Sequence, residues 1–447
     1  MVQFTLRQTK ELLTSQSGLA LVGALLNRTR LKGALDRLPS PKERGFTIRN
    51  SEIALSMIGL LAQGKSDFEA IEPFIHDRFF SLALQIKRVP SAETLRQRLD
   101  KATDAWDQVI RHNVVQLLAN HTHLTACYED YIPVDADVSP MDNSGTKKEG
   151  VSLTYKKFEG YSPLMVYIGQ EGYWLDLDFR PGSAHSQCEG TVAFLSNMLE
   201  SLAELGYSKY LFRADSGHDS ADNYQAIEQF NGKHPDVQVD FIVKHNRRQE
   251  TKQMWLEFAK AEGEKHTPRE GKTVYTGRRL KRFANVEKPL YQVYEVTVRT
   301  SKPDGQQLLF PELQVDVYTT SLDRPPEVII ELYHDHATSE QFHSEIKSDM
   351  GLERLPSGYF ATNQRVMFLA MVAFNLLRIM GQESLDYQGN PIKTRHRIRR
   401  RRLRSVIQDL IYLAARLIYH ARGWTLGFGQ GAPFYHTFEH LYYLWSG

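Results

Sequence analysis

The spacing of apolar residues changes along this chain, and the change limits the folds that it can adopt. Up to about residue 125, apolar residues recur at helical spacing, as in SGLALVGALLNRTRLKGAL and SEIALSMIGLLAQ. After residue 131, short runs rich in Val, Ile, Tyr and Phe and bounded by Gly and Pro predict β-strands. A chain of 447 residues is also too long for one ordinary core, so two or three domains are expected. We therefore predict a mixed α/β protein with a helical N-terminal region.

The predicted strands fall into two groups. In the first, YIPVDADVS, SPLMVYIGQ and YWLDLDFRP follow one another with short turns, as in an antiparallel meander, while KYLFRADSG and VQVDFIVKHN alternate with helices. The second group lies within residues 251–322, where TVYTGRRLKRFA, LYQVYEVTVRT and QQLLFPELQVDVYTTS predict a β-rich insertion. A helix over about 326–350 and a long apolar helix over about 361–381 are expected to follow.

The composition indicates the general class of the protein and the cellular compartment in which we expect it. Apolar residues make up 41% and charged residues 24% of the chain, both ordinary for a globular protein, and the net charge of +2 identifies no partner. Cys127 and Cys188 lack metal-ligand spacing and predict a reducing compartment without disulfides. The first residues do not resemble a signal peptide, and no apolar run reaches the roughly 18–20 residues that span a bilayer. We expect a cytoplasmic protein that does not contact a membrane.

Two aspartates stand at the ends of predicted strands. Asp137 lies in YIPVDADVSP, with Asp135 two residues earlier on the same face of the strand. Asp215 follows an apolar strand in YLFRADSGHDS, just before a Ser-Gly turn. Carboxylates at strand ends beside loops are common functional positions in mixed sheets. Asp also caps turns and helices, so a structural role is the alternative for each.

A third group of polar residues follows at helical spacing in ELYHDHATSEQFHSEIKSDM. Tyr333, Glu340 and Lys347 are seven residues apart, and His336 and His343 fill the intermediate positions. An α-helix advances about 100° per residue, so these side chains would form one stripe. The stripe suits a charged ligand, and a solvated helix face is the alternative.

Three acids in such positions suggest a site for hard divalent cations. Mg²⁺ prefers oxygen ligands, and two such ions about 4 Å apart can support phosphoryl transfer. A Gly-rich phosphate loop of the Walker type is absent, which argues against a nucleotide hydrolase. HEXXH and CXXC are also absent, which argues against a zinc site.

The strand aspartate in VDADVS, the RADSG strand and the Tyr-x2-His-x3-Glu-x6-Lys helix together resemble the DDE transposases of bacterial insertion sequences. The resemblance is to the cut-and-paste group that carries a β-rich insertion between the second aspartate and the glutamate, and it covers about residues 130–380. It implies a ribonuclease H-like catalytic core. It also implies that Asp137, Asp215 and Glu340 bind the catalytic metal, which would be two Mg²⁺ ions with Mn²⁺ as an alternative.

Carried over to neighbouring positions, the resemblance assigns further roles. Asp135 is the rival of Asp137 for the first metal position, and Asp137 is preferred because Ser139 follows it as in the family's Asp-x-Thr/Ser pattern. Tyr333 and Lys347 would contact phosphates of the transposon end.

The chain departs from the family signature at His336, where the family has Arg. Histidine is only partly charged at neutral pH and cannot form a bidentate contact with phosphate. Either His336 contributes less than the arginine would, or Arg213 or His334 replaces it; the sequence does not decide between these.

Two further segments are predicted to contact DNA. Trp255, in KQMWLEFAK, is a candidate for stacking on a flipped base, as an insertion-domain aromatic does in this group, with a core position as the alternative. Between Lys393 and Arg404 the sequence holds eight Lys or Arg residues and no acid, which favours contact with nucleic acid. The residues taken as representative of this run are Arg399, Arg400, Arg401 and Arg402.

The full prediction is a DNA transposase that works as a metal-dependent polynucleotidyl transferase. It would cleave at the terminal inverted repeats, join the 3′-hydroxyl to target DNA, act as a homodimer on paired ends and associate with the bacterial nucleoid. The alternatives are a non-catalytic DNA-binding relative that represses or bridges sites, and a hydrolytic nuclease of the same fold. The predicted domains are a helical DNA-binding domain at 1–128, a catalytic core at 129–250 and 323–385, the insertion at 251–322 and a basic C-terminal segment at 386–447.

Overall fold

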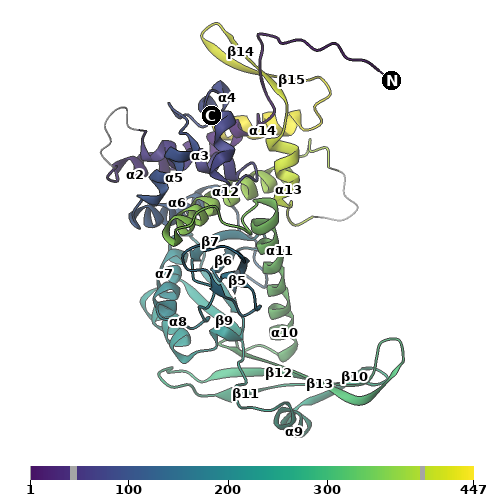
Figure 1. The fold of residues 1–447 in the computed structure, drawn as a ribbon. Helices are drawn as coiled ribbons and strands as arrows, with labels where there is room; N and C mark the ends of the chain where they lie inside the picture. Colours follow the sequence, from purple (N-terminus) through teal and green to yellow (C-terminus); the bar gives the residue numbers. More distant parts are fainter. Residues whose placement is uncertain (1, 41–47, 393–397) are drawn as a thin grey trace. The chain divides into compact units, whose positions relative to one another are not determined.

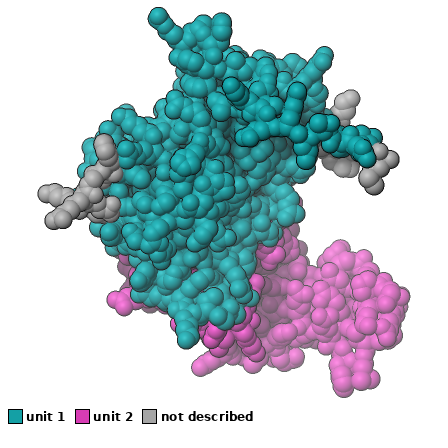
Figure 2. All heavy atoms as spheres, turned by 45° about the horizontal axis from the view of Figure 1, so that its top comes forward, with its two compact units in different colours: residues 1–122, 141–151, 344–447 teal, residues 123–140, 152–343 magenta. Residues whose placement is uncertain are grey.

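The computed structural model describes residues 2–40, 48–392 and 398–447 and divides into two compact units, coloured separately in Figure 2. Unit 1 comprises Met1–Thr122, Met141–Val151 and Ser344–Gly447. Unit 2 comprises His123–Pro140 and Ser152–His343. The four domains predicted from the sequence are a functional division, which this division by contacts does not test.

Unit 1 is mainly helical, which confirms the predicted helical N-terminal region. Its helices are α1 (Leu19–Asn27), α2 (Leu31–Arg37), α3 (Asn50–Leu61), the 3₁₀ helix η1 (Phe68–Phe74), α4 (Arg78–Ala83), α5 (Ala92–Asp100), α6 (Ala105–His121), α12 (Phe360–Asp386), α13 (Leu403–Val406), the π-turn η5 (Ile407–Ile411) and α14 (Tyr435–Ser446). A small antiparallel sheet joins the two ends of the chain. It has the order β1 (Leu12–Thr14), β14 (Ala415–His420), β15 (Gly423–Phe428).

Helix α12 is the central helix of unit 1 and packs against α3 and α6. By length and composition it could cross a membrane, which corrects the expectation that no apolar run is long enough. Its most apolar window is 89% buried inside the protein, as in a core helix. Two arginines within it are buried and paired: Arg365 lies 2.9 Å from Asp104, and Arg378 lies 3.0 Å from Glu345. Buried charges are stable only with such partners.

Unit 2 is built on a nine-stranded sheet in the order β10-β11-β12-β13-β9-β8-β2-β6-β7. The five core strands are β2 (Ile132–Val138), β6 (Leu164–Ile168), β7 (Tyr173–Asp178), β8 (Lys209–Ala214) and β9 (Gln238–Lys244). Strand β2 pairs antiparallel with β6 and parallel with β8, β6 pairs antiparallel with β7, and β8 pairs parallel with β9. This mixed arrangement around β2 confirms the predicted ribonuclease H-like core.

Helices flank the core sheet in unit 2. Helices α7 (Thr191–Ala203) and α8 (Ala221–Lys233) lie on one side of it, and α10 (Pro326–His334) lies on the other (Figure 1). Their apolar faces cover strands that are buried along nearly their whole length, as expected for parallel strands.

One predicted connection was wrong. A tight turn joins β6 to β7, as expected for a meander, but residues 139–163 separate β2 from β6. That segment contains only the short strands β3 (Met141–Asp142), β4 (Ser152–Leu153) and β5 (Glu159–Tyr161). Strands of two or three residues leave no readable alternation in the sequence.

The β-rich insertion is confirmed, and it extends the core sheet. Its elements are α9 (Lys252–Glu262), β10 (Glu264–Arg269), β11 (Lys272–Lys281), β12 (Leu290–Ser301) and β13 (Gln307–Thr320). The end of β13 pairs antiparallel with β9, with Tyr318 opposite Lys244. Long strands β11 to β13 carry the sheet away from the core, and α9 lies against them (Figure 1).

The predicted single helix over about 326–350 is segmented. It consists of α10, a 3₁₀ turn η3 (Asp335–Thr338), α11 (Ser339–Ser344) and a π-turn η4 (Glu345–Asp349). A 3₁₀ turn is tighter and a π-turn wider than an α-helix. Residues seven apart therefore do not fall on one straight line, and the stripe predicted from an ideal helix is broken.

Candidate active site

Asp137 and Asp215 come to the same edge of the core sheet. Strands β2 and β8 are parallel, and their last paired residues are Ala136 and Ala214. Each aspartate is the next residue along its strand, and neighbouring strands lie about 4.8 Å apart. Asp215 also caps the 3₁₀ turn η2 (Ser216–His218), where its Oδ1 accepts a hydrogen bond from the Gly217 N–H at 3.0 Å.

Glu340 is exposed on α11, which is fixed to the core sheet by a neighbouring side chain. Phe342 is 2% exposed, and its ring centroid lies 5.0 Å from that of Tyr167 on β6. Gly172, in the turn between β6 and β7, lies so close that a Cβ there would be 2.0 Å from the Phe342 ring. The close packing of Phe342 therefore fixes the turn of helix that presents Glu340.

The three acids act electrostatically on one another. Burial raises the pKa of Asp137 to about 6, and the negative charges of Asp215 and Glu340 act in the same direction. His336 and the Val138 N–H oppose the shift. Burial is the main cause of the raised pKa, and the smaller contributions of Asp215 and Glu340 mean that their charges lie within electrostatic range of Asp137.

Tyr155 is a site residue that the sequence did not suggest. Its hydroxyl lies 3.4 Å from the Val138 carbonyl oxygen, although its ring is 65% exposed. Desolvation of the hydroxyl raises the pKa of Tyr155 to about 12, with the charges of Asp137, Asp215 and Glu340 adding to the shift. The residue lies in the irregular segment after β2, where no sequence pattern marks it.

Two histidines also lie beside the aspartates. His343 is buried, and its Nδ1 is 3.6 Å from Asp137 Oδ2, beyond ordinary hydrogen-bond distance. His218 is buried at the end of η2, and burial lowers its pKa to about 4 in spite of the charge of Asp215. At neutral pH His218 is therefore an uncharged neighbour of the site.

Asp135 is enclosed by partners. Its Oδ1 and Oδ2 accept hydrogen bonds from Arg213 Nε at 2.7 Å and Nη2 at 2.8 Å, and His336 Nδ1 lies 3.0 Å from Oδ1. Although burial opposes the effect, Arg213 and His336 hold the pKa of Asp135 below its usual value. The side chain of Asp135 is 6% exposed, whereas that of Asp137 is 22% exposed. Asp137 is thus the more accessible of the two acids.

The contacts of Asp135 and Arg213 also determine the surroundings of His336, which stands where the family has arginine. Arg213 is 3% exposed, and its Nη1 donates to the Leu332 carbonyl at 2.6 Å. Its guanidinium therefore forms hydrogen bonds with internal partners, Asp135 and the backbone of α10. His336 is buried against Asp135, while His334 is exposed.

Tyr333 lies in unit 2 with the acids, and Lys347 belongs to unit 1. The Tyr333 ring is 4.6 Å from Tyr318 and 5.6 Å from His336, measured between centroids. Burial raises the pKa of Tyr333, as do the charges of Asp215 and Asp137, so its hydroxyl remains a hydrogen-bond donor. Lys347 Nζ lies 3.9 Å from Glu353 Oε2.

Trp255 occupies the core of the insertion. It is 3% exposed and packs with Tyr294 and Phe258, and the Arg279 guanidinium lies 4.5 Å from its ring. Its Nε1 donates to Glu250 at 3.1 Å. In this arrangement the ring faces other side chains of the insertion. Its stacking on a flipped base stays a prediction.

The arginines of the basic run differ in their surroundings. Arg401 is buried and pairs with Asp409, and it donates to Ser384 at 2.9 Å. Arg402 pairs with Asp349 at 2.8 Å, while Arg399 is exposed and Arg400 is half-buried. The earlier part of the run, at 393–397, lies outside the described residues. The run is therefore not uniformly a solvated surface.

The donor chemistry of the three acids fits a divalent cation. Carboxylate oxygens are the ligands that Mg²⁺ prefers, and a bound cation would lower the pKa of Asp137, which burial and, to a smaller extent, the charges of Asp215 and Glu340 raise. Within the described ranges, no three His, Cys, Asp or Glu residues are gathered closely enough to hold one ion as they stand.

Comparisons with known proteins place these observations in context. The family model described as "Transposase DDE domain group 1" matches residues 3–444. A search of curated proteins gave no match. Among solved structures, the chain is similar to piggyBac transposase in a synaptic complex with hairpin DNA, with 11% sequence identity and a TM-score of 0.45. That alignment covers 90% of this chain and 80% of the other, and it is too distant to transfer a site or a mechanism.

Proposed function

The chain belongs to the family of DDE-domain transposases, and we propose that it cuts one DNA strand at each end of a mobile element and transfers the freed 3′-hydroxyl to target DNA. In the first step water attacks a phosphodiester, and the bond from phosphorus to O3′ breaks. In the second step the 3′-hydroxyl attacks another phosphodiester, forming a new P–O bond and releasing a strand end. The second attack falls either on the opposite strand, which forms a hairpin, or directly on target DNA.

The observation that carries this proposal is that Asp137, Asp215 and Glu340 all lie in unit 2, where the charges of Asp215 and Glu340 act on Asp137. Two of the acids extend neighbouring parallel strands, and the charge of the third raises the pKa of the first. The sequence predicted these acids from strand ends and from a helix more than 120 residues further on. Their proximity supports one carboxylate site.

Each side chain has a proposed role. Asp137, Asp215 and Glu340 would hold two divalent cations, Mg²⁺ or alternatively Mn²⁺. When bound, these ions supply the positive charge that activates an attacking oxygen and stabilises a leaving one. The Tyr333 hydroxyl would donate a hydrogen bond to a phosphate oxygen near the acids, and Lys347 would contribute a positive charge to the transposon end.

The surroundings of Asp135 favour a structural role for this residue over a role as a metal ligand. Both of its oxygens already accept hydrogen bonds from Arg213. We propose that Asp135 and Arg213 fix the orientation of His336, which takes the place of the family arginine without matching its bidentate grip on phosphate. In this arrangement Arg213 does not replace the missing arginine.

Substitution of Asp215 by Asn tests whether the protein is an enzyme. The assay uses plasmid DNA that carries the gene with its genomic flanks, with nicking followed on gels and binding followed by mobility shift. The proposal predicts loss of nicking with retained binding. A DNA-binding relative that acts without catalysis would behave the same before and after the change.

A second assay separates a transposase from a nuclease of the same fold. An end fragment labelled at its 3′ terminus is incubated with unlabelled target plasmid and divalent metal. Transposition predicts covalent transfer of the label to the plasmid, whereas a hydrolytic nuclease yields only free cleaved ends.

The proposed partners are the terminal inverted repeats and target DNA, bound by a homodimer that pairs two ends. The N-terminal helices would read the repeats, and exposed cations such as Arg399 would add affinity that falls as salt rises. Crosslinking of the protein with one or two end fragments tests the dimer, because pairing predicts a two-subunit product that depends on DNA.

A further inference from the structure

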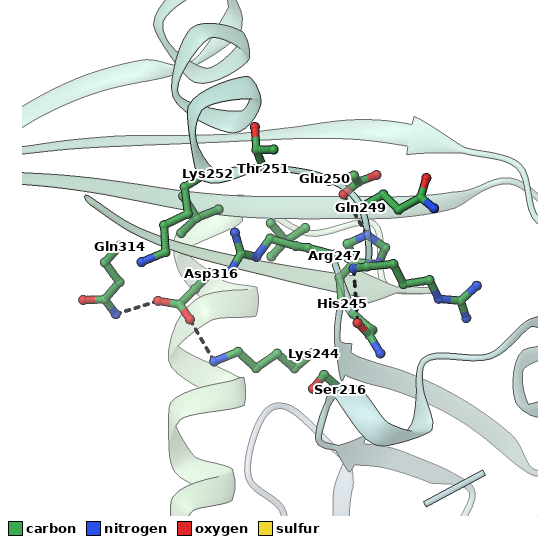
Figure 3. A pocket seen from close by; sticks show the side chains of 14 residues that line it. Ser216, Lys244, His245, Arg247, Gln249, Glu250, Thr251, Lys252, Gln314 and Asp316 are labelled. Atoms are coloured by element: carbon green, nitrogen blue, oxygen red, sulfur yellow. Dashed lines mark hydrogen bonds and ion pairs between the residues drawn. The ribbon is translucent and has the colours of Figure 1, made fainter. Parts of the chain in front are cut away.

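A polar pocket of about 640 Å³ lies where β9 leaves the core for the insertion (Figure 3). Residues 244–252 line much of it, and 314–317 of β13 line another part. Ser216, the residue after Asp215, also belongs to the lining. The pocket therefore lies where the insertion meets the turn that presents the second acid of the candidate site.

At this pocket His245 stands between two carboxylates. Its Nδ1 is 2.7 Å from Asp219 Oδ2, and its Nε2 is 3.1 Å from Glu250 Oε2. His245 is 8% exposed. Each ring nitrogen of His245 thus faces one carboxylate oxygen. We call this carboxylate–imidazole–carboxylate arrangement the His245 bridge.

One end of the bridge fixes the turn that carries Asp215. Asp219 immediately follows η2, and its Oδ2 also accepts a hydrogen bond from the Asn246 N–H at 2.8 Å. The Tyr224 hydroxyl on α8 donates to its other oxygen. Although burial opposes the effect, His245 close by and the Tyr224 hydroxyl lower the pKa of Asp219. Asp215 and Asp219 thus mark the two ends of one short, firmly held turn.

The other end of the bridge, Glu250, directly precedes the insertion and contacts residues of it. Glu250 Oε2 accepts the hydrogen bond from Trp255 Nε1 at 3.1 Å, and its Oε1 lies 3.8 Å from cations of both Arg279 and Lys281 on β11. Trp255 is buried, and Arg279 stacks on it. Movement of α9 or β11 would therefore move Glu250.

A bridge of this kind is a costly way to fill a core. Removing charges from water costs several kcal/mol per ion, and well-packed apolar residues often stabilise a protein as well as a buried ion pair does. Buried polar networks do impose one specific geometry. The geometry imposed here links the insertion to the turn after β8.

We propose that His245 is a positioning residue, and that the His245 bridge sets the position of the turn carrying Asp215 according to the position of the insertion. DNA bound to the insertion would thereby change the position of Asp215, the second acid of the proposed active site. This inference rests on the proposed function only in giving Asp215 a catalytic role.

A double-mutant cycle on Asp219→Asn and Glu250→Gln tests the coupling. Asp219 and Glu250 are joined through His245, so independent sites would give additive effects and a working bridge would not. We expect each single change to lower the rate of strand cleavage at least tenfold with DNA affinity unchanged, and the double variant to be no slower than the slower single variant. Additive losses, or no loss, would overturn the proposal.

A control removes a more exposed His–Glu pair that does not lie at the site. His234 Nε2 lies 3.0 Å from Glu200 Oε2, and the pair connects the region of α7 and α8. Glu200→Gln is expected to leave the cleavage rate within twofold of the wild type. An equal loss in this control would show that the cycle reports general loosening of unit 2, and would count against the bridge.

Hydrogen–deuterium exchange gives a readout without DNA or metal. In Glu250→Gln, we expect faster amide exchange in the peptide covering 215–219, and no such change in Glu200→Gln. Should Glu250→Gln fail to fold, Trp255→Phe removes the N–H that orients Glu250, and the same acceleration is expected. Unchanged exchange at 215–219 would refute the bridge.

The two proposals can fail separately. If the wild-type protein does not cleave DNA but exchange at 215–219 responds to Glu250→Gln, the proposed function is wrong and the bridge stands. If the wild type cleaves DNA and Glu250→Gln changes neither exchange nor cleavage, the bridge alone is wrong.

Discussion

Replacing Asp137 with asparagine is expected to stabilise the metal-free protein at pH 8, although the change removes an acid of the proposed site. Burial and the charges of Asp215 and Glu340 raise the pKa of Asp137 to about 6, so its ionised form is costly in the folded state. An asparagine at this position keeps the shape of the side chain and an acceptor for the Val138 N–H, but it carries no charge. Residues that an active site requires for function often lower the stability of the folded protein.

The size of the effect follows from the shift in pKa. The pKa rises from 3.8 to about 6, and each unit corresponds to about 1.4 kcal/mol, so the ionised carboxylate costs roughly 3 kcal/mol. The side chain is 22% exposed, so solvent screens the charge only in part. For a domain of 150–250 residues, a gain of this size raises the melting temperature by roughly 6–12 °C.

The effect has a definite dependence on pH. A carboxyl whose pKa is higher in the folded state favours folding while it is protonated, and this contribution is complete below the unfolded value of 3.8. It is lost as the pH rises through about 6. The wild type and Asp137→Asn should therefore be nearly equal in stability near pH 4 and diverge up to about pH 7.

Thermal unfolding with a metal chelator at pH 4.5 to 8 measures this difference. Asp130→Asn is a suitable control, because Asp130 also lies in unit 2 but its side chain is 80% exposed. Addition of Mn²⁺ at pH 8 should raise the melting temperature of the wild type and leave that of Asp137→Asn nearly unchanged. Equal melting temperatures of the metal-free wild type and Asp137→Asn at pH 8 would refute the claim that the ionised Asp137 carboxylate destabilises the folded state.

Three further predictions concern packing and charge. Gly172→Ala should destabilise unit 2 and slow DNA cleavage, because Gly172 has a φ of +69° and its new Cβ would meet the Phe342 ring beneath α11; circular dichroism melts and nicking rates measure both effects, and an unaltered melt would contradict the packing argument. Trp255→Ala should cost about 3–5 kcal/mol of unfolding free energy by emptying a buried site, and a variant with full stability but lost DNA cleavage would favour base stacking instead. Arg399→Ala should weaken DNA binding and reduce the slope of log binding constant against log salt concentration by about one unit. Arg401→Ala should mainly lower stability, because that side chain is buried and paired with Asp409. The reverse result in binding and melting assays would contradict these assignments.

Much of the core sheet could be predicted because its strands carry their own signal. Buried strands of five to seven residues such as β2, β8 and β9 form apolar runs bounded by turn residues. Asp137 and Asp215 interrupt or end those runs, so their placement at a sheet edge could also be inferred. The long connection after β2 could not, since its strands are too short to show a pattern.

The surroundings of the predicted residues depended on contacts distant in sequence. Asp135 and Asp137 look equivalent in VDADVS, and the partner that distinguishes them, Arg213, lies 78 residues away. The segmentation of the helix after residue 326 was equally hidden, because 3₁₀ and π-turns share the composition of α-helices. Trp255 could be read as a core residue or as a surface for a base until its neighbours on β11 and β12 were known.

Mn²⁺ binding measured by electron paramagnetic resonance tests the central claim most directly, namely that Asp137, Asp215 and Glu340 form one cation site. The titration is made with and without a DNA duplex, on the wild type, on Asp137→Asn, Asp215→Asn and Glu340→Gln, and on the control Asp130→Asn. We predict that each of the three substitutions weakens Mn²⁺ binding at least tenfold while the control binds as the wild type does. Wild-type affinity in any one of the three variants would contradict the assignment of that acid to a shared site.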